Sequence, residues 1–297
     1  MTDPAPVFES SDEVALNALL TQLLAAVSQQ FFHMLLLGKR GRADLAARLK
    51  RVDDQDFPNA MQIVDLLLRE GAQIRVAPHA VAPAQSTAAI LRTELAFERD
   101  LAAFLPSLAM RSPEAQERLA SAMAPRDDYR GWLVEILRHT PVDPSSGRRE
   151  SPQLFSVLLQ LMEQTLLHAF ANWHDGRTAE ASTSWQISGA AMLYLTALSD
   201  FCGSDDQASG GIEIPGSTVV DRTARFGADL HLVRESASAA RRLAEVSDDL
   251  ALAALCLTIA EDCGRIAGTR NGEPIRAELG QSAVFRNFRR ARHRMTR

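Results

Sequence analysis

Cysteine and lysine are scarce in this 297-residue chain. The three cysteines, Cys202, Cys256 and Cys263, include no C-x-x-C pair, which excludes a disulfide framework and a zinc finger. Cys256 and Cys263 lie on one face of a predicted helix, where we expect buried thiols in a reducing cytoplasm. Only Lys39 and Lys50 are available for Schiff-base chemistry. The G-x-S-x-G, G-x-x-x-x-G-K-[ST] and G-x-G-x-x-G motifs are absent, so the sequence offers no familiar nucleophile or phosphate-binding loop.

Long apolar runs and a strong charge of one sign are missing too. No uninterrupted apolar run reaches the ~18–20 residues that span a bilayer, and Met1–Pro6 has none of the features of a secretory signal. The net charge of −5 favours no class of partner, and a hydrophobic content of 46% argues against disorder. We therefore predict a cytoplasmic protein with no membrane span, large enough for two domains of roughly 140 residues each.

The two-residue alternation typical of strands is also absent, and apolar residues instead recur at three- and four-residue spacing. This spacing predicts an all-α fold. Pro58 lies inside one predicted helix and is expected to kink it. The expected helices are 12–37, 42–70, 86–110 and 112–138 in the first half, and 151–175, 177–202, 218–246 and 247–268 in the second.

The same order of elements occurs twice, at an offset of about 140 residues. Each half reads helix, short turn, helix, long crossover, helix, short turn, helix, which predicts a four-helix bundle with its crossover between the second and third helices. A generic pair of helical bundles is the alternative. The predicted division is a flexible N-terminus (1–11), a first bundle (12–143), a second bundle (150–272) and a basic tail (273–297).

Short segments of the first half resemble bacterioferritin and the wider ferritin-like superfamily. They are Leu16–Thr21, Phe31–His33 with a glycine about eight residues on, Leu66–Gly71 and Leu91–Leu95. The second half echoes them in His168 with Gly176 and in Leu232–Glu235. The resemblance implies two tandem ferritin-like four-helix bundles that mimic a dimer within one chain, and a homo-oligomer is a further expectation.

The same resemblance implies a metal centre made by two lone glutamates and two Glu-x-x-His pairs, which hold two iron or manganese ions. The positions that match are mostly changed here. The lone first-helix glutamate is replaced by Leu23 in the first half and Leu158 in the second, and the fourth-helix pair of the first half reads Arg126-x-x-Tyr129. Only Glu94, with Asp56 in the second helix, keeps a carboxylate there. Because an arginine repels a cation, the resemblance implies a degenerate di-iron site.

Three residues of the second half offer a different metal site. His231 lies four residues before Glu235 and shares its helix face, and Glu261 keeps the glutamate of the fourth-helix pair. Imidazole and carboxylate together suit one iron, manganese or zinc ion, and Glu235 and Glu261 are then the catalytic candidates. The alternative is that Glu235 pairs with nearby arginines on a solvated face. The expected cofactor is accordingly none, or a single Fe or Mn ion in the second bundle.

Glu94 is the catalytic candidate of the first half. It shares a helix face with Glu98, and burial of the pair would raise one pKa enough for a general acid. The alternative is that Glu94 is neutralised by Arg126 or bonded by Tyr129 across the bundle. Arg126 and Tyr129 are also the candidate ligand-binding residues.

Aromatic residues recur near the predicted helix ends and suggest either a pocket for an aromatic ligand or ordinary core packing. They are Tyr129, Trp132, Trp173, Trp185 and Tyr194.

Two functions remain open. The first is a degenerate ferritin-like protein that binds a small organic molecule or a partner protein in its bundles. The alternative is a ferritin-like enzyme, such as an oxygen-using oxidoreductase of a specialised biosynthetic pathway, with a rearranged metal site in the second bundle. Six arginines in 286–297 suit either an anionic partner or docking on the acidic body of the chain.

Overall fold

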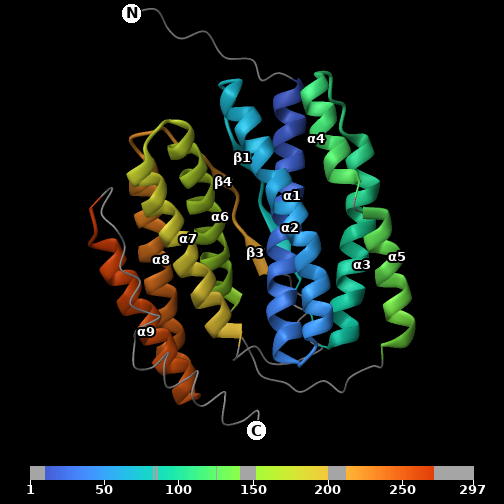
Figure 1. Ribbon diagram of the computed structural model, residues 1–297. Coiled ribbons are helices and arrows are strands. Elements are labelled where there is room, and N and C mark those ends of the chain that lie inside the picture. Colours follow the sequence, from blue (N-terminus) through green and yellow to red (C-terminus); the bar gives the residue numbers. More distant parts are fainter. Residues whose placement is uncertain are drawn as a thin grey trace, which may run out of the picture. The chain divides into compact units, whose positions relative to one another are not determined.

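The computed structural model describes residues 11–82, 84, 86–124, 126–140, 152–199 and 212–270. This part of the chain is mostly helical (Figure 1), which confirms the predicted all-α character. The predicted basic tail and nearly all of the N-terminal segment lie outside the described residues, and so does Cys202.

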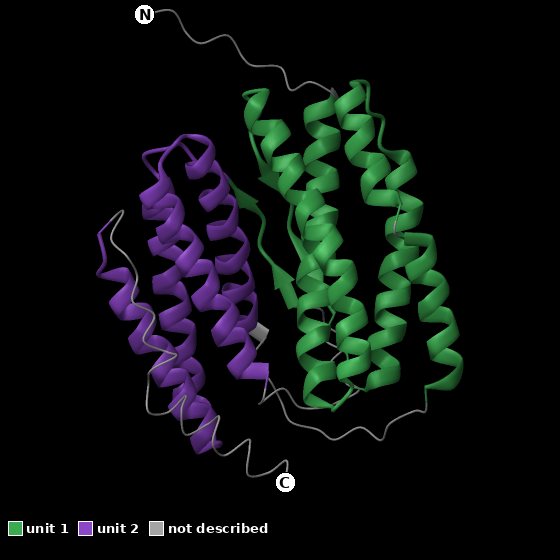
Figure 2. Cartoon of the chain, viewed as in Figure 1, with its two compact units in different colours: residues 1–146, 204–218 green, residues 147–203, 219–297 purple. Residues whose placement is uncertain are grey.

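The chain divides into two compact units (Figure 2). Unit 1 comprises residues 1–146 and 204–218, and unit 2 comprises 147–203 and 219–297. The first boundary lies in the predicted linker. The second crossover is grouped with unit 1, whereas the sequence analysis kept it within the second bundle.

In the part of unit 1 that the structure describes, there are two long antiparallel helices and three shorter ones. Leu19, Leu23 and Leu67 are among its fully buried side chains, and Ser86 and Ser112 cap two of its helices by accepting backbone hydrogen bonds. Its helices are α1 (Ser11–Lys39), α2 (Ala43–Arg69), α3 (Thr87–Phe104), α4 (Pro113–Met123) and α5 (Arg126–His139), with a 3₁₀ turn, η1 (Leu105–Ser107), after α3.

The fourth predicted helix is two helices, α4 and α5. The sequence places Pro125 at their junction, and proline has no N–H to continue a helical ladder. Pro58, in contrast, lies within a continuous α2.

The described residues of unit 2 form four helices. Asp249 caps the last of them by accepting hydrogen bonds from the N–H groups of Ala251 and Leu252. The helices are α6 (Pro152–His174), α7 (Thr178–Leu198), α8 (Arg225–Val246) and α9 (Leu250–Ala267).

Four short strands, which the sequence analysis did not predict, lie in the two crossovers and pair within unit 1. β1 (Arg75–Val76) pairs with β4 (Ser217–Thr218), and β2 (His79–Val81) pairs with β3 (Ile212–Ile214). Both pairings are antiparallel and follow one register. Two crossovers that are far apart in the sequence therefore form one narrow ribbon.

A stripe of polar side chains on α1 holds the backbone of the first crossover. Asn17 Oδ1 accepts the N–H of Arg75 at 2.7 Å, and Thr21 Oγ1 accepts the N–H of Ala77 at 3.0 Å. Gln29 bonds both backbone groups of Ala82, at 2.7 and 3.0 Å. These side chains recur at multiples of four residues, so they share one face of α1. The stripe satisfies crossover backbone groups that strand pairing leaves over.

The turn between the first two helices has the same geometry in each unit. Gly41 in unit 1 and Gly176 in unit 2 have φ angles of 72° and 71°. The following residues, Arg42 and Arg177, have similar φ and ψ angles and precede helices that begin at Ala43 and Thr178. The positive φ explains glycine at this place, since other residues avoid that conformation.

Two helices, α1 and α6, are long and apolar enough to cross a membrane by length and composition. The sequence analysis expected no such segment, because it sought an uninterrupted apolar run. In each helix 78% of the apolar window is buried within the structure, as in the core helix of a soluble protein.

Candidate functional site

Three fully buried or nearly buried charged side chains meet in the interior of unit 1. Arg126, at the start of α5, donates from Nη2 to Asp56 Oδ1 of α2 and from Nη1 to Glu98 Oε1 of α3, each at 2.6 Å. Its Nε donates to the carbonyl of Ala122 at 3.1 Å, and Gln30 of α1 donates to Asp56 Oδ2 at 3.3 Å. The guanidinium thus links α2, α3 and α5 from a fixed position.

Burial sets the charge of this cluster. Burial raises the pKa of Glu98 to about 7; Arg126 opposes the rise, and the carboxylates of Asp56 and Glu94 add to it. Burial also raises the pKa of Asp56 against the effect of Arg126. Burial lowers the pKa of Arg126, but the two facing carboxylates raise it by more, so the guanidinium stays charged. Glu98 Oε2 is buried without a hydrogen-bond partner in the described chain.

A second set of bonds surrounds Glu94 on α3. His33 Nδ1 of α1 lies 2.5 Å from Glu94 Oε1, and the Tyr129 hydroxyl donates to Glu94 Oε2 at 3.1 Å. Gln29 Nε2 lies 2.8 Å from His33 Nε2. Burial and the Glu94 carboxylate raise the pKa of Tyr129 well above its ordinary value, so Tyr129 is a neutral donor.

Part of this arrangement was predicted from the sequence. The pairing of Glu94 with Tyr129 is present. The alternative was a pairing of Glu94 with Arg126, but Arg126 bonds to Asp56 and Glu98 instead. His33 was used in the sequence only as a landmark of the family resemblance. A histidine in an apolar helix, four residues after a glutamine, could have indicated a buried hydrogen-bonded pair.

The residues of unit 1 do not fit the dinuclear metal centre that the resemblance implies. Arg126 bonds to both Asp56 and Glu98, so its charge lies between the carboxylates where a bridging cation would have to bind. Leu23 of α1 is fully buried and supplies no ligand. Within the described ranges, no three His, Cys, Asp or Glu side chains are grouped so that they could hold a metal ion.

The structure places the three residues of the predicted metal site of unit 2 at the surface. His231, Glu235 and Glu261 all lie on exposed faces of α8 and α9. His231 Nε2 is 3.6 Å from Glu235 Oε1, in an i,i+4 pair whose side chains are 71% and 49% exposed. The helix faces that carry these residues turn to solvent because apolar neighbours such as Val233 and Ile259 occupy the core. Exposed side chains of this kind do not form the enclosed site that the enzyme hypothesis requires.

A buried histidine–acid pair lies in unit 2, and it was not predicted from the sequence. His168 Nδ1 of α6 is 2.6 Å from Asp229 Oδ1 of α8, and Ser184 of α7 donates to Asp229 Oδ2 at 2.8 Å. Gln164 Nε2 lies 2.7 Å from His168 Nε2. The serine hydroxyl points at the carboxylate and not at the imidazole, so this is no nucleophile–base pair.

The same glutamine, histidine and acid recur in both units with the same spacing. His33 and Glu94 are 61 residues apart, as are His168 and Asp229. In both units the glutamine lies four residues before the histidine. The shift in number from His33 to His168 equals the shift from Gly41 to Gly176, so the set and the turn repeat together.

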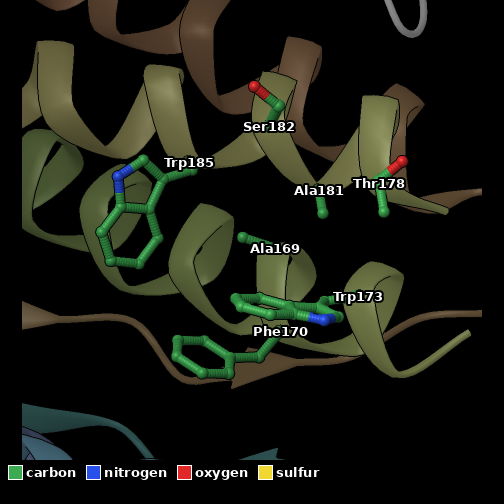
Figure 3. A pocket seen from close by; sticks show the side chains of 7 residues that line it. All are labelled: Ala169, Phe170, Trp173, Thr178, Ala181, Ser182 and Trp185. Carbon is green, nitrogen blue, oxygen red and sulfur yellow. The ribbon is translucent and has the colours of Figure 1, made fainter. Parts of the chain in front are cut away.

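The five predicted aromatic residues divide into core and surface. Tyr129 and Tyr194 are buried, and Trp132 stacks on Tyr129 with a centroid distance of 5.7 Å. Trp173 and Trp185 are 69% and 52% exposed and line a hollow between α6 and α7 (Figure 3). Its volume is about 450 Å³.

No family model, no curated protein and no solved structure matches this chain. The fold and the site define a mostly helical protein of two units, with an arginine-neutralised acid cluster in the first and an aromatic-lined hollow in the second.

Proposed function

We propose that this chain is a ferritin-like protein of two tandem repeats that binds a small organic molecule and has lost the dinuclear metal centre of that superfamily. The observation that carries the proposal is the position of Arg126. Its guanidinium bonds to Asp56 and Glu98 at 2.6 Å each and satisfies buried carboxylates that would otherwise need a metal.

The recurrence of the Gln–His–acid set, in step with the recurrence of the glycine turn, supports the tandem repeat. In each repeat the set ties the first helix to the third through a histidine and a carboxylate. A generic pair of bundles has no reason to place a glutamine, a histidine and an acid at the same spacing in both. The set also uses the third-helix carboxylate for a bond to histidine, which leaves it less available to a metal.

Binding of a small organic molecule is supported by the hollow between α6 and α7. A volume of about 450 Å³ falls in the range of small-molecule pockets. Its lining is apolar and aromatic, the usual composition of such pockets. A protein partner is the other occupant that such a surface admits.

Elemental analysis tests the metal-free part of the proposal. The full chain is expressed with added iron and manganese and purified without chelators or a histidine tag. The expected metal content is far below one ion per chain. One or two ions per chain in the wild type, with a clear loss in Glu94→Gln, would contradict the proposal because Glu94 would then be a ligand.

Mass spectrometry of an organic extract tests the binding part on the same preparation. A small molecule that co-purifies in stoichiometric amount with the full chain is the expected result. Recovery of a stoichiometric protein partner with no such molecule would favour the protein-partner alternative.

A further inference from the structure

The hollow in unit 2 lies within one helix pair, close to the turn that joins its helices. α6 contributes Ala169, Phe170 and Trp173, and α7 contributes residues from its first two turns. Figure 3 shows Trp185 on one side and Trp173 on the other, with the small side chain of Ala169 between them. Small residues flanked by large rings leave a space that neither helix fills.

Packing of the helix pair does not require these tryptophans. The first helix pair has a turn of the same geometry at Gly41, which corresponds to Gly176. When the two turns are aligned on these glycines, Gly38 stands in place of Trp173 and Lys50 in place of Trp185. The turn therefore forms with no aromatic ring at either position. Two large apolar side chains that are 69% and 52% exposed bury too little surface to be explained by core stability.

The lining defines the chemistry of the ligand. Among the described residues, no charged side chain lines the hollow. The hydroxyl oxygens of Thr178 and Ser182, the two lining residues that carry a hydroxyl group, point away from the aromatic rings in Figure 3. A charged ligand would lose hydration there without gaining a partner. Phe170 and Trp185 already meet edge to face, with centroids 6.3 Å apart, and a flat ring would extend that arrangement.

We propose that the hollow lined by Trp173 and Trp185 binds a neutral, flat aromatic ring system. The inference rests on the proposed function, in that it names the site and the class of the small organic molecule. Aromatic faces favour an aromatic ligand over a saturated one of equal size, because stacked and edge-to-face contacts add to the gain from burial.

Nuclear magnetic resonance of the tryptophan indole N–H groups tests the site in the full chain. The chain has three tryptophans, Trp132, Trp173 and Trp185, which are assigned by single replacements with phenylalanine. The probe is 2-naphthol, titrated up to its solubility limit. The expected result is saturable shifts of the Trp173 and Trp185 signals and none of the Trp132 signal. Shifts of Trp132 alone, or no saturable shift, overturn the proposal.

Two related probes test the ligand class. 2-Naphthoate adds a charge to the same ring system, and 2-decalol is saturated and not flat. We expect each to bind about tenfold more weakly than 2-naphthol or worse, given the cost of burying an unpaired charge and the loss of aromatic contacts. Equal affinity for either probe overturns the assignment to that class.

A pair of variants separates the site from the fold. Ala181→Leu fills the hollow with a good helix former, and we expect at least about a tenfold loss of 2-naphthol affinity with an unchanged circular dichroism spectrum. Leu250→Ala removes an apolar side chain that is 85% exposed on α9, outside the hollow, and is expected to bind as the wild type does. Equal loss in both variants, or none in Ala181→Leu, overturns the site.

The two proposals fail in different experiments. Metal bound through Glu94 contradicts the proposed function, while saturable naphthol shifts at Trp173 and Trp185 still support the site. A metal-free protein with no such shifts contradicts the site alone.

Discussion

At the residue scale, the arginine of the acid cluster is the side chain on which the interior of unit 1 most depends. Arg126 bonds to two carboxyl groups that are fully buried, and a buried charge without a partner is strongly destabilising. We expect Arg126→Leu to lower the free energy of unfolding by about 3–5 kcal/mol in urea denaturation.

Two comparisons make this result specific. Arg130→Leu breaks an exposed pair with Asp127 and is expected to cost under about 1 kcal/mol. The triple change Asp56→Asn, Glu98→Gln, Arg126→Leu removes every charge of the cluster and should recover much of the lost stability. If Arg126→Leu by itself leaves the free energy of unfolding unchanged, the stranded-charge argument is ruled out.

Glu98 gives the cluster a pH dependence. Its pKa in the folded chain is about 7, above the ordinary value of 4.5, so between these values the folded state holds a proton that the unfolded chain has released. The stabilising contribution of this proton is complete below pH 4.5 and is lost as the pH rises through about 7. Arg126 of α5, Asp56 of α2 and Glu94 beside it on α3 set the local field.

We expect Glu98→Gln to remove this dependence, because glutamine can still accept the bond from Arg126 but does not titrate. Urea denaturation from pH 5 to pH 8 should show the wild type losing stability relative to the variant, by up to about 1.4 kcal/mol per pH unit. Glu117→Gln, at an exposed position on α4, should run parallel to the wild type. A constant difference between Glu98→Gln and the wild type across this range would contradict the raised pKa.

At the element scale, the ribbon of crossover strands depends on one close approach. Gly216 lies between β3 and β4, and a Cβ atom there would come within 2.6 Å of the carbonyl oxygen of Val76. Because that oxygen belongs to the backbone of β1, it cannot move aside without disturbing the strand pair. We expect Gly216→Ala to destabilise unit 1 by about 1–3 kcal/mol, the usual range for overpacking.

A matched glycine in the same unit gives the opposite expectation. Gly131 lies inside α5 with open space around it, and alanine there should stabilise the helix by about 0.5–1 kcal/mol. Thermal unfolding monitored by circular dichroism would report both changes. If both glycine variants gained stability, the close approach at Gly216 would be wrong.

The helices were predictable and the ribbon was not. Long apolar periodicity and capping residues such as Ser112 located most helix ends to within a few residues. The exceptions are the end of α3 at Phe104, predicted at 110, the start of α8 at Arg225, predicted at 218, and the division between α4 and α5. Strands this short carry no alternation to detect, and each pairs with a strand from the other half of the sequence. Their signal lay in α1, where Asn17, Thr21 and Gln29 form a polar stripe in an apolar helix.

The acid cluster shows the same limit at the level of side chains. Spacing placed Glu94 and Glu98 on one face of α3, but the rotation of α2 and α5 about their axes decides which carboxylate meets Arg126. That rotation follows from the packing of whole helices, which a single sequence does not specify. For the same reason, the sequence left open whether His231 and Glu261 face the core or the solvent, and the structure places both on exposed faces.

At the scale of the whole molecule, the second half of the sequence contributes a segment to unit 1. Residues 204–218 follow two helices of unit 2 and yet belong to unit 1, where β3 and β4 complete the ribbon. Backbone pairing of this kind is cooperative with the apolar side chains that alternate on one face, here Ile212 and Ile214, which are both buried. The second half of the sequence is therefore expected to be part of the fold of unit 1.

Cutting the chain between the units tests whether β3 and β4 hold the second half of the sequence to unit 1. A protease site introduced within residues 141–150 allows the folded protein to be cut outside all four strands of the ribbon. We expect the fragments to co-elute as one species in size-exclusion chromatography, because β3 and β4 still pair with β1 and β2. The double variant Ile212→Ser, Ile214→Ser weakens the ribbon and should release the fragments from each other at a lower urea concentration. The ribbon joins segments from both sides of the cut. Immediate separation of the fragments of the cut wild type would therefore show that the pairing of β3 and β4 with β1 and β2 contributes little to holding them together.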